Sequence, residues 1–400
     1  MARTRTRRLR RMGSVGLFAA AAALSAVTLP AHAAPEGQTA GAGRPGSVGG
    51  SYVVTLRGDT KARSAAGQSI AERYGARIGH IYGTALNGYA VHADASQARR
   101  LAADPRVASV VRDSRVRLDA TQVNPPSWGL DRMDQRDLPL DGRYRRPPSE
   151  GDGVTVYVID TGIRITHKDF GGRARYGWDF VGNDRTAQDG NGHGTHVAGI
   201  IAGTAYGVAK KARVVAVRVL DDAGTGTTSQ VIAGIDWVTR HAHKPAVANL
   251  SLGGSYSAQL DAAVRNSIRA GVTYTVAAGN DGLPAALYSP ADVPEAITVG
   301  ATDGKDARAG FSNFGSALDL FAPGVSITSA WYASDTRRAT CSGTSMAAPH
   351  AAGAAALYLS GHPGAAPAQV AGALVAGAAS GKVSGAGPGS PNKLLQVPRA

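Results

Sequence analysis

Three short blocks of the chain each hold a side chain that could take part in hydrolysis. Asp160 stands in the block VIDTG, His193 in NGHGTH and Ser345 in GTSMAAP. A serine hydroxyl becomes a nucleophile at neutral pH when an imidazole accepts its proton, and a carboxylate can orient that imidazole and stabilise its cation. The three blocks therefore predict a hydrolase in which Ser345 attacks, His193 is the base and Asp160 orients the base.

Each residue also has a structural interpretation when it is taken alone. A serine or aspartate before a helix most often caps it, and His193 with His196 resembles a zinc pair. Their spacing of three lacks the Glu and the four-residue step of His-Glu-x-x-His, which disfavours zinc. The block at Ser345 is not the elbow Gly-x-Ser-x-Gly, which disfavours an α/β-hydrolase. Cys341 is the only cysteine, so no intramolecular disulfide can form, and we interpret it as a small buried apolar residue.

The three blocks, in this order, resemble the subtilase family of serine endopeptidases. The longer wording DGNGHGTH, with the segments GVAKK, VLDD and SLGG, resembles the proteinase K-like branch of that family. The resemblance extends from about Trp128 to Leu395. It implies a secreted endopeptidase that cleaves proteins through an acyl-enzyme on Ser345 and needs no organic cofactor.

The resemblance also implies the rest of the site. Asn280, in the block AAGN, matches the family's side-chain donor to the oxyanion. Other residues match the two edges that pair with an extended substrate and the wall of the pocket for the side chain before the scissile bond (P1): Gly224, Thr225, Gly226, Ser251, Leu252, Gly253, Gly254, Ala277, Ala278 and Gly279. Because these walls are small and apolar, and we expect no acid beside them, the sequence predicts a preference for apolar or aromatic P1 side chains.

A calcium site is a further implication of the resemblance. By position, the carbonyl groups of Pro294 and Ala296 and the carboxylate of Asp319 match a site of the family. Oxygen ligands of this kind suit Ca²⁺. Only Asp319 contributes a side chain, so a solvated aspartate is the alternative interpretation.

The elements that must position these residues follow from the pattern between Gly153 and the end of the chain. Short apolar runs at 154–159, 213–219, 246–250, 272–277 and 296–299 predict buried strands. Helical segments at 193–203, 228–241, 258–270 and 345–359 alternate with them. Such alternation predicts an α/β fold with a mostly parallel, doubly wound sheet, in which ligands bind at the carboxyl ends of the strands. Asp160 closes one strand, and Asn280 follows another.

Residues 51–118 predict a separate small domain. Strands at 52–56, 78–82, 88–91 and 107–111, with helices at 65–74 and 96–103, give the order β-α-β-β-α-β of a ferredoxin-like α+β domain; Ser96 is the expected cap of the second helix. Its place ahead of residues 121–400 is similar to that of the family's inhibitory propeptide. A plain binding domain is the alternative. We expect maturation near Leu118 to Thr121.

The start of the chain predicts export. Residues 1–33 combine six arginines, a short apolar stretch and Ala31-His32-Ala33, as in a secretory signal peptide. Residues 34–50 are rich in Gly, Ala and Pro and predict a linker. A membrane anchor is disfavoured because the apolar stretch is too short. The twin arginines leave the Sec and Tat export routes open.

The net charge of +14 does not predict a nucleic-acid partner. Residues 1–33 carry +6 and residues 34–120 carry +5, which leaves +3 for residues 121–400. A nucleic-acid binder needs a basic patch on its working domain. We therefore expect a monomer whose partners are protein substrates and its own propeptide, with neither nucleic acid nor membrane. An inactive binding protein is the remaining rival, although every catalytic position is filled.

Overall fold

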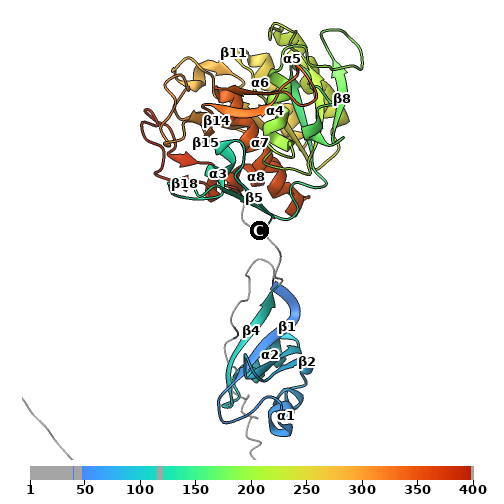
Figure 1. The fold of residues 1–400 in the computed structure, drawn as a ribbon, viewed down its shortest axis with the longest axis vertical. Coiled ribbons are helices and arrows are strands. Elements are labelled where there is room, and N and C mark those ends of the chain that lie inside the picture. Colours follow the sequence, from blue (N-terminus) through green and yellow to red (C-terminus); the bar gives the residue numbers. More distant parts are fainter. Residues whose placement is uncertain (1–38, 40–46, 115–119, 398–400) are drawn as a thin grey trace, which may run out of the picture. The chain divides into compact units, whose positions relative to one another are not determined.

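The structure is a computed structural model that describes residues 39, 47–114 and 120–397. The chain divides into two compact units, Met1–Arg115 and Val116–Ala400 (Figure 1). The predicted signal peptide and the first half of the predicted maturation region, residues 118 and 119, lie outside the described residues. Within the described residues, no helix is long and apolar enough to cross a membrane.

The first unit is a four-stranded antiparallel sheet with two helices, in the order β-α-β-β-α-β. Its elements are β1 (Ser47–Leu56), α1 (Ala65–Arg73), β2 (Arg77–Tyr82), β3 (Gly88–His92), α2 (Ala95–Ala102) and β4 (Val107–Ser114). The spatial order is β2-β3-β1-β4. The unit has its own core, in which Ile70 and Leu101 from the helices pack against Val54 and Tyr89 from the sheet. The predicted α+β fold is confirmed. β1 begins at Ser47, inside the predicted linker.

The second unit is built on a sheet of nine strands in its described part, with helices on both faces (Figure 1). From one edge to the other, the strands are β8 (Ala174–Asp179), β9 (Arg213–Arg218), β7 (Thr155–Asp160), β10 (Ala246–Leu250), β12 (Thr273–Ala277), β14 (Ile297–Thr302), β15 (Leu320–Pro323), β19 (Lys393–Leu394) and β18 (Ala379–Ser380). All neighbours are parallel except β18 and β19. The predicted mostly parallel sheet is confirmed.

The helices divide between the two faces of this sheet. They are α3 (Trp128–Met133), α4 (His193–Ala202), α5 (Thr228–His241), α6 (Ala258–Arg269), α7 (Thr344–Gly361) and α8 (Pro367–Gly377). Strand β7 shows the division, because Val156 and Val158 join the core with α4 and α7, whereas Tyr157 and Ile159 join the core with α5 and α6. This alternation is the two-residue period of a strand buried on both sides.

Several short elements complete the unit. They are the antiparallel pairs β5 (Ala120–Val123) with β6 (Arg143–Arg146), β11 (Gly254–Ser255) with β13 (Tyr288–Ser289), and β16 (Ile327–Ala330) with β17 (Arg338–Cys341), and two 3₁₀ turns, Lys168–Phe170 and Ala285–Leu287. Helix α7 packs against α4 and against β10, β12 and β14. This packing brings the start of α7 to the carboxyl ends of the central strands.

Candidate active site

Asp160 and His193 are in direct contact. Asp160 is the last residue of β7 and is fully buried, and His193 is the first residue of α4. The Nδ1–H of His193 donates to Oδ1 of Asp160 over 2.7 Å. The same oxygen accepts from the backbone N–H of Thr161 at 2.8 Å. The parallel sheet thus delivers the acid at the end of a strand, where the neighbouring helix presents the imidazole.

The electrostatics of the pair favour the charged imidazole. Burial of the ring opposes protonation, but the charge of Asp160, its hydrogen bond and the more distant charge of Asp189 together raise the pKa of His193 above its usual value. The site can therefore hold an imidazolium next to a carboxylate. That is the state that forms when the ring takes a proton from a nucleophile.

Ser345 is the second residue of α7, where unpaired backbone N–H groups gather. Its hydroxyl donates to the carbonyl of Ser251 over 3.0 Å, and the hydroxyl of Ser251 donates back to the carbonyl of Ser345 over 2.8 Å. No hydrogen bond joins Ser345 Oγ to the His193 ring in the described structure. Ser251 and His193 both line one groove.

Asn280 lies beside Ser345 in a cavity of about 340 Å³. Its Oδ1 accepts from the backbone N–H of Thr344 at 2.8 Å and from the hydroxyl of Thr344 at 2.9 Å. These two bonds fix which end of the amide is the donor. The Nδ2 group of Asn280 is therefore the end of the amide that can donate a hydrogen bond into the cavity shared with Ser345.

Asn313 holds the turn that carries Asn280, a role that no motif in the sequence indicates. It is fully buried; its Nδ2 donates to the carbonyl of Ala278, and its Oδ1 accepts from the N–H groups of Asp281 and Leu283. Gly279 has φ +101°, and a Cβ there would lie 2.3 Å from Asn313 Nδ2. The turn thus requires glycine for both its backbone conformation and this close approach.

The two predicted substrate edges face one groove. The lining of a cavity of about 900 Å³ includes residues 223–228, residues 251–257 and His193. All seven residues predicted as edges, from Gly224 to Gly226 and from Ser251 to Gly254, are in this lining. Two facing stretches of backbone are suited to pair with an extended chain.

The predicted P1 wall lines the other cavity, together with an acid that we did not expect. Ala277, Ala278 and Gly279 are part of its lining, as are Asp281 and Tyr288. Desolvation and the neighbouring Asp281 raise the pKa of the Tyr288 phenol. The expectation that no acid stands near this wall was therefore wrong, because the turn after Asn280 brings Asp281 back towards the pocket.

The predicted calcium ligands lie at neighbouring strand ends. Asp319 precedes β15, its Oδ2 accepts from Thr298 N at 2.8 Å, and Ala296 directly precedes β14. Burial raises the pKa of Asp319 to about 6. A desolvated carboxylate without a basic side chain among its described hydrogen-bond partners fits a bound cation. The described residues contain no cluster of three or more His, Cys, Asp or Glu side chains that could hold a metal.

His196 and Cys341 stand outside the chemistry. The ring of His196 is fully buried, its Nε2 lies 3.1 Å from the Ile327 carbonyl, and burial lowers its pKa to about 4. His196 is therefore a neutral histidine packed in the interior. Cys341 is a half-buried residue of β17, and burial raises the pKa of its thiol.

Two family models match the chain. One, described as "Subtilase family", matches residues 151–394, and the other, "Peptidase inhibitor I9", matches residues 51–119. The first match covers more than half of the chain and spans Asp160, His193 and Ser345. The second coincides with the first structural unit.

Similar proteins are also known individually. An extracellular serine proteinase of Thermus sp. (strain Rt41A) is 57% identical over 324 residues, which are 81% of this chain and 78% of the relative. A cuticle-degrading serine protease of Arthrobotrys oligospora is 42% identical over 394 residues, with 93% and 96% of the two chains covered. The crystal structure of a cold-adapted subtilisin-like serine proteinase matches with a TM-score of 0.67 and 54% identity, over 68% of this chain and 98% of that one.

Proposed function

The chain belongs to the subtilase family of serine proteases, and from that premise we propose that Ser345, His193 and Asp160 hydrolyse peptide bonds of protein substrates through an acyl-enzyme. The observation that carries this assignment of residues is the 2.7 Å bond between His193 Nδ1 and Asp160 Oδ1. It orients the ring so that Nε2 is free to act on the hydroxyl of Ser345, which lines the adjoining cavity.

Each group then has one chemical task. When substrate enters, Ser345 Oγ turns from the Ser251 carbonyl, gives its proton to His193 Nε2 and attacks the scissile carbonyl carbon. The imidazolium is stabilised by Asp160 and then protonates the leaving amine. Water repeats the sequence on the acyl-enzyme, with His193 again as base, and the second product leaves as a carboxylic acid.

The oxyanion of each tetrahedral intermediate is proposed to lie between two donors. One is the backbone N–H of Ser345 near the start of α7, and the other is Nδ2 of Asn280. The positive end of the helix dipole favours negative charge at the same place. Donors fixed before the reaction stabilise charge as it develops and need no rearrangement.

Substrate would bind as an extended strand between the segments Gly224–Gly226 and Ser251–Gly254. The P1 side chain would enter the cavity bounded by Ala277, Ala278 and Gly279. Its small apolar walls support a preference for apolar or aromatic side chains, and Asp281 in the lining gives a long basic side chain a secondary partner. We infer broad specificity with an apolar preference.

The first unit is proposed to act as propeptide, folding aid and intramolecular inhibitor. The match to the inhibitor family over residues 51–119 supports this role. The proposed maturation bond lies near Leu118 to Thr121, and the extracellular relative supports secretion. The mature enzyme would act as a monomer on protein substrates. Pro294, Ala296 and Asp319 would hold Ca²⁺, which would supply charge compensation at the two strand ends.

The test is casein hydrolysis by secreted protein, with and without a serine-directed inhibitor. We expect both the inhibitor and the substitution Ser345→Ala to abolish hydrolysis. N-terminal sequencing of active material should give a start near residues 118–121. Hydrolysis that survives Ser345→Ala would refute the assigned nucleophile, and active enzyme that starts at Ala34 would refute the propeptide.

A further inference from the structure

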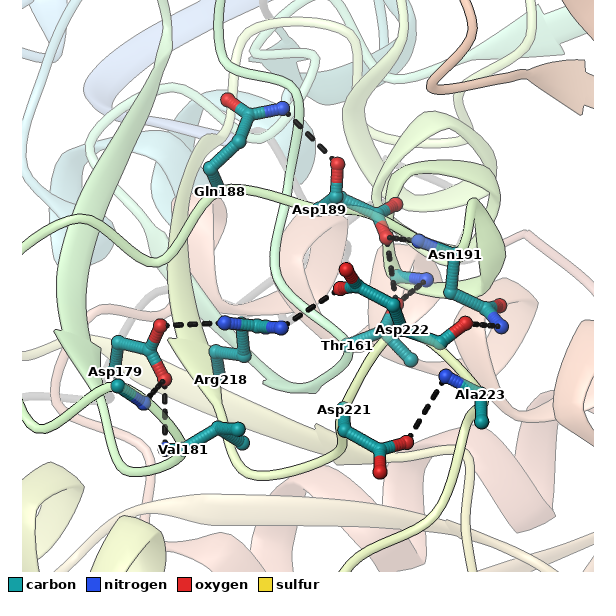
Figure 2. A network of polar contacts seen from close by, with 12 residues as sticks. Thr161, Asp179, Val181, Gln188, Asp189, Asn191, Arg218, Asp221, Asp222 and Ala223 are labelled. Carbon is teal, nitrogen blue, oxygen red and sulfur yellow. Dashed lines mark hydrogen bonds and ion pairs between the residues drawn. The ribbon is translucent and has the colours of Figure 1, made fainter.

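A second buried carboxylate, that of Asp189, lies beside the Asp160–His193 pair. It is 2% exposed, and its hydrogen bonds reach two segments, Thr161 after β7 and the residues 191–195 at the start of α4. Figure 2 shows Thr161 and Asn191 gathered at this carboxylate. These are the segments that carry the acid and the base, although Asp189 takes no part in the chemistry described so far.

Each oxygen of the carboxylate accepts hydrogen bonds from donors among the described residues. Oδ1 accepts from the Thr161 hydroxyl at 2.9 Å, from Asn191 N at 2.9 Å and from Gly192 N at 2.8 Å. Oδ2 accepts from Thr195 N at 2.9 Å and from the Thr195 hydroxyl. Gly192, the residue at the N-cap of α4, has no side chain to cap the helix. Asp189 therefore supplies the acceptor and the negative charge that a helix start favours.

Thr161 connects the two segments through both of its polar groups. Its N–H donates to Asp160 Oδ1, and its hydroxyl donates to Asp189 and accepts from Gly194 N at 2.9 Å. A Cβ on Gly194 would lie 2.1 Å from the carbonyl oxygen of Gly162. The start of α4 therefore lies directly against the end of β7, and the Thr161–Asp189 bond fixes it there.

Asp189 also acts on His193 by charge. It adds to Asp160 in raising the pKa of the histidine, while His196 on the same helix is neutral. The nearby Arg218 is bound by Asp179 and Asp222, each over 2.7 Å (Figure 2). The charge of Asp189 is thus not paired with this arginine and remains available to the ring.

We propose that Asp189 is a positioning residue of the catalytic pair: it ties the end of β7 to the start of α4, so that His193 Nδ1 stays on Asp160, and its charge stabilises the imidazolium. This inference rests on the proposed roles of Asp160, His193 and Ser345. Asp189 lines neither of the two substrate cavities, so its effect should appear in turnover rather than in substrate binding.

The first experiment compares Asp189→Asn with the parent enzyme on a peptide substrate. We expect kcat to fall about 10- to 100-fold, the scale of a small misplacement of a catalytic group, with KM unchanged within about twofold. Because Asp189 raises the pKa of His193, its neutralisation should shift the acid limb of kcat/KM to lower pH.

The matched control is Asp179→Asn. Asp179 is equally buried, at 2% exposed, and also accepts from backbone N–H groups, those of Val181 and Gly182, but it faces Arg218 instead of the start of α4. We expect it to leave the acid limb in place. An unmoved acid limb in Asp189→Asn, or an equal shift in Asp179→Asn, would overturn the proposal.

A second readout does not depend on activity. In the Ser345→Ala background, the ¹⁵N resonances of His193 should titrate at lower pH when Asp189 is replaced by Asn, and an identical midpoint would overturn the charge role. This measurement stands even if Ser345 proves not to be the nucleophile.

If Asp189→Asn does not fold, the variants Thr161→Val and Thr161→Ser test the same proposal. Thr161→Val should lower kcat and Thr161→Ser should restore it. An equal kcat in both variants would refute the proposed role of the Thr161–Asp189 hydrogen bond.

Discussion

At the scale of single residues, the site depends on side chains that hold other side chains. Ser251 and Ser345 exchange hydrogen bonds between hydroxyl and carbonyl groups, and Thr344 fixes the amide of Asn280. In each pair, a neighbour in the fold determines where a reacting group points before substrate arrives. Such prior orientation is what makes hydrogen-bond donors effective in a transition state.

The Thr344 hydroxyl can be tested directly. Thr344→Val removes one of the two bonds to Asn280 Oδ1, so the amide should lose its fixed orientation. We expect kcat to fall about 10-fold with KM nearly unchanged, which is less than the roughly 100- to 1000-fold measured for removal of such a donor in subtilisin itself. Thr344→Ser should recover most of the loss. Thr340→Val, which removes a hydroxyl on exposed β17, serves as control, and an equal loss there would contradict the prediction.

The sequence indicates the proposed reacting residues more readily than the residues that support them. Asp160, His193 and Ser345 stand in blocks whose chemistry restricts the residue type, and Asn280 was proposed through the resemblance to the family. Asn313 could not be predicted, because its role depends on a turn 30 to 35 positions earlier in the chain. The same holds for Asp281, whose approach to the P1 pocket follows from the path of that turn.

At the scale of elements, periodicity predicts what is buried and fails where contacts are local or polar. The five strands and four helices that were predicted in this unit are found within three residues of their predicted limits, because their apolar patterns reflect burial on both faces of the sheet. Strand β15 and helix α8 were not predicted. β8 (Ala174–Asp179) was missed because it is an edge strand with exposed and polar positions. Ser96 was predicted to cap α2, but Asp94 does so, with its Oδ1 2.8 Å from Gln97 N.

The close packing of α7 against the segment that contains Val208 depends on a glycine. A Cβ on Gly353 would lie 2.5 Å from Cβ of Val208, whereas one on Gly361 in the same helix would meet nothing within 4 Å. We expect Gly353→Ala to destabilise the protein by about 1–3 kcal/mol through overpacking, despite its better helix propensity. Gly361→Ala should be close to neutral. Thermal unfolding in the Ser345→Ala background measures both, and equal midpoints would contradict the close approach.

The start of α6 carries a pH-dependent contact. Asp261 is 1% exposed, and burial together with Asp261 raises the pKa of Asp292. A carboxyl whose pKa is higher in the folded state stabilises the fold at low pH, and this contribution is lost as pH rises through the folded-state pKa. Asp292→Asn stays neutral at all pH values. We therefore expect a higher Tm than the parent at pH 8 and little difference at pH 3.5.

The control for this prediction is the exposed Asp152→Asn, which should change Tm at neither pH. Arg265, whose charge lowers the pKa of Asp292, is paired with Glu295 at 3.4 Å, and both residues are unaltered in the comparison. A Tm difference for Asp292→Asn that is the same at pH 3.5 and pH 8 would argue against a titrating pair.

At the scale of the whole molecule, each unit has a hydrophobic core of its own. Separate cores could be predicted because the strand-helix pattern changes between residues 118 and 153. Inhibition of the second unit by the first can be tested with the two units as separate proteins. If the first is the inhibitor, residues 51–119 added in trans should inhibit mature enzyme, and a Leu101→Asp form, which places a charge in that core, should inhibit much less.

The dependence of stability on bound calcium also belongs to the molecule as a whole. If Asp319 helps to hold Ca²⁺, a chelator at pH 8 should lower Tm of the Ser345→Ala protein. Removal of a ligand present at 100 times its Kd costs about 2.7 kcal/mol, which is about 5–10 °C for a domain of this size. Asp319→Asn should start lower and show no further drop. A midpoint that the chelator leaves unmoved in the parent would exclude the site.

The order of strands in the large sheet has a consequence for biosynthesis. β19 (Lys393–Leu394) lies between β15 and β18, although it is the last strand among the described residues. During translation Ser345 is synthesised well before this strand. The nine-stranded sheet can therefore be completed only after residue 394 has been made. The small N-terminal unit, by contrast, is complete after little more than a quarter of translation. The two units can therefore complete their folds at different stages of synthesis, the small one early and the large one late.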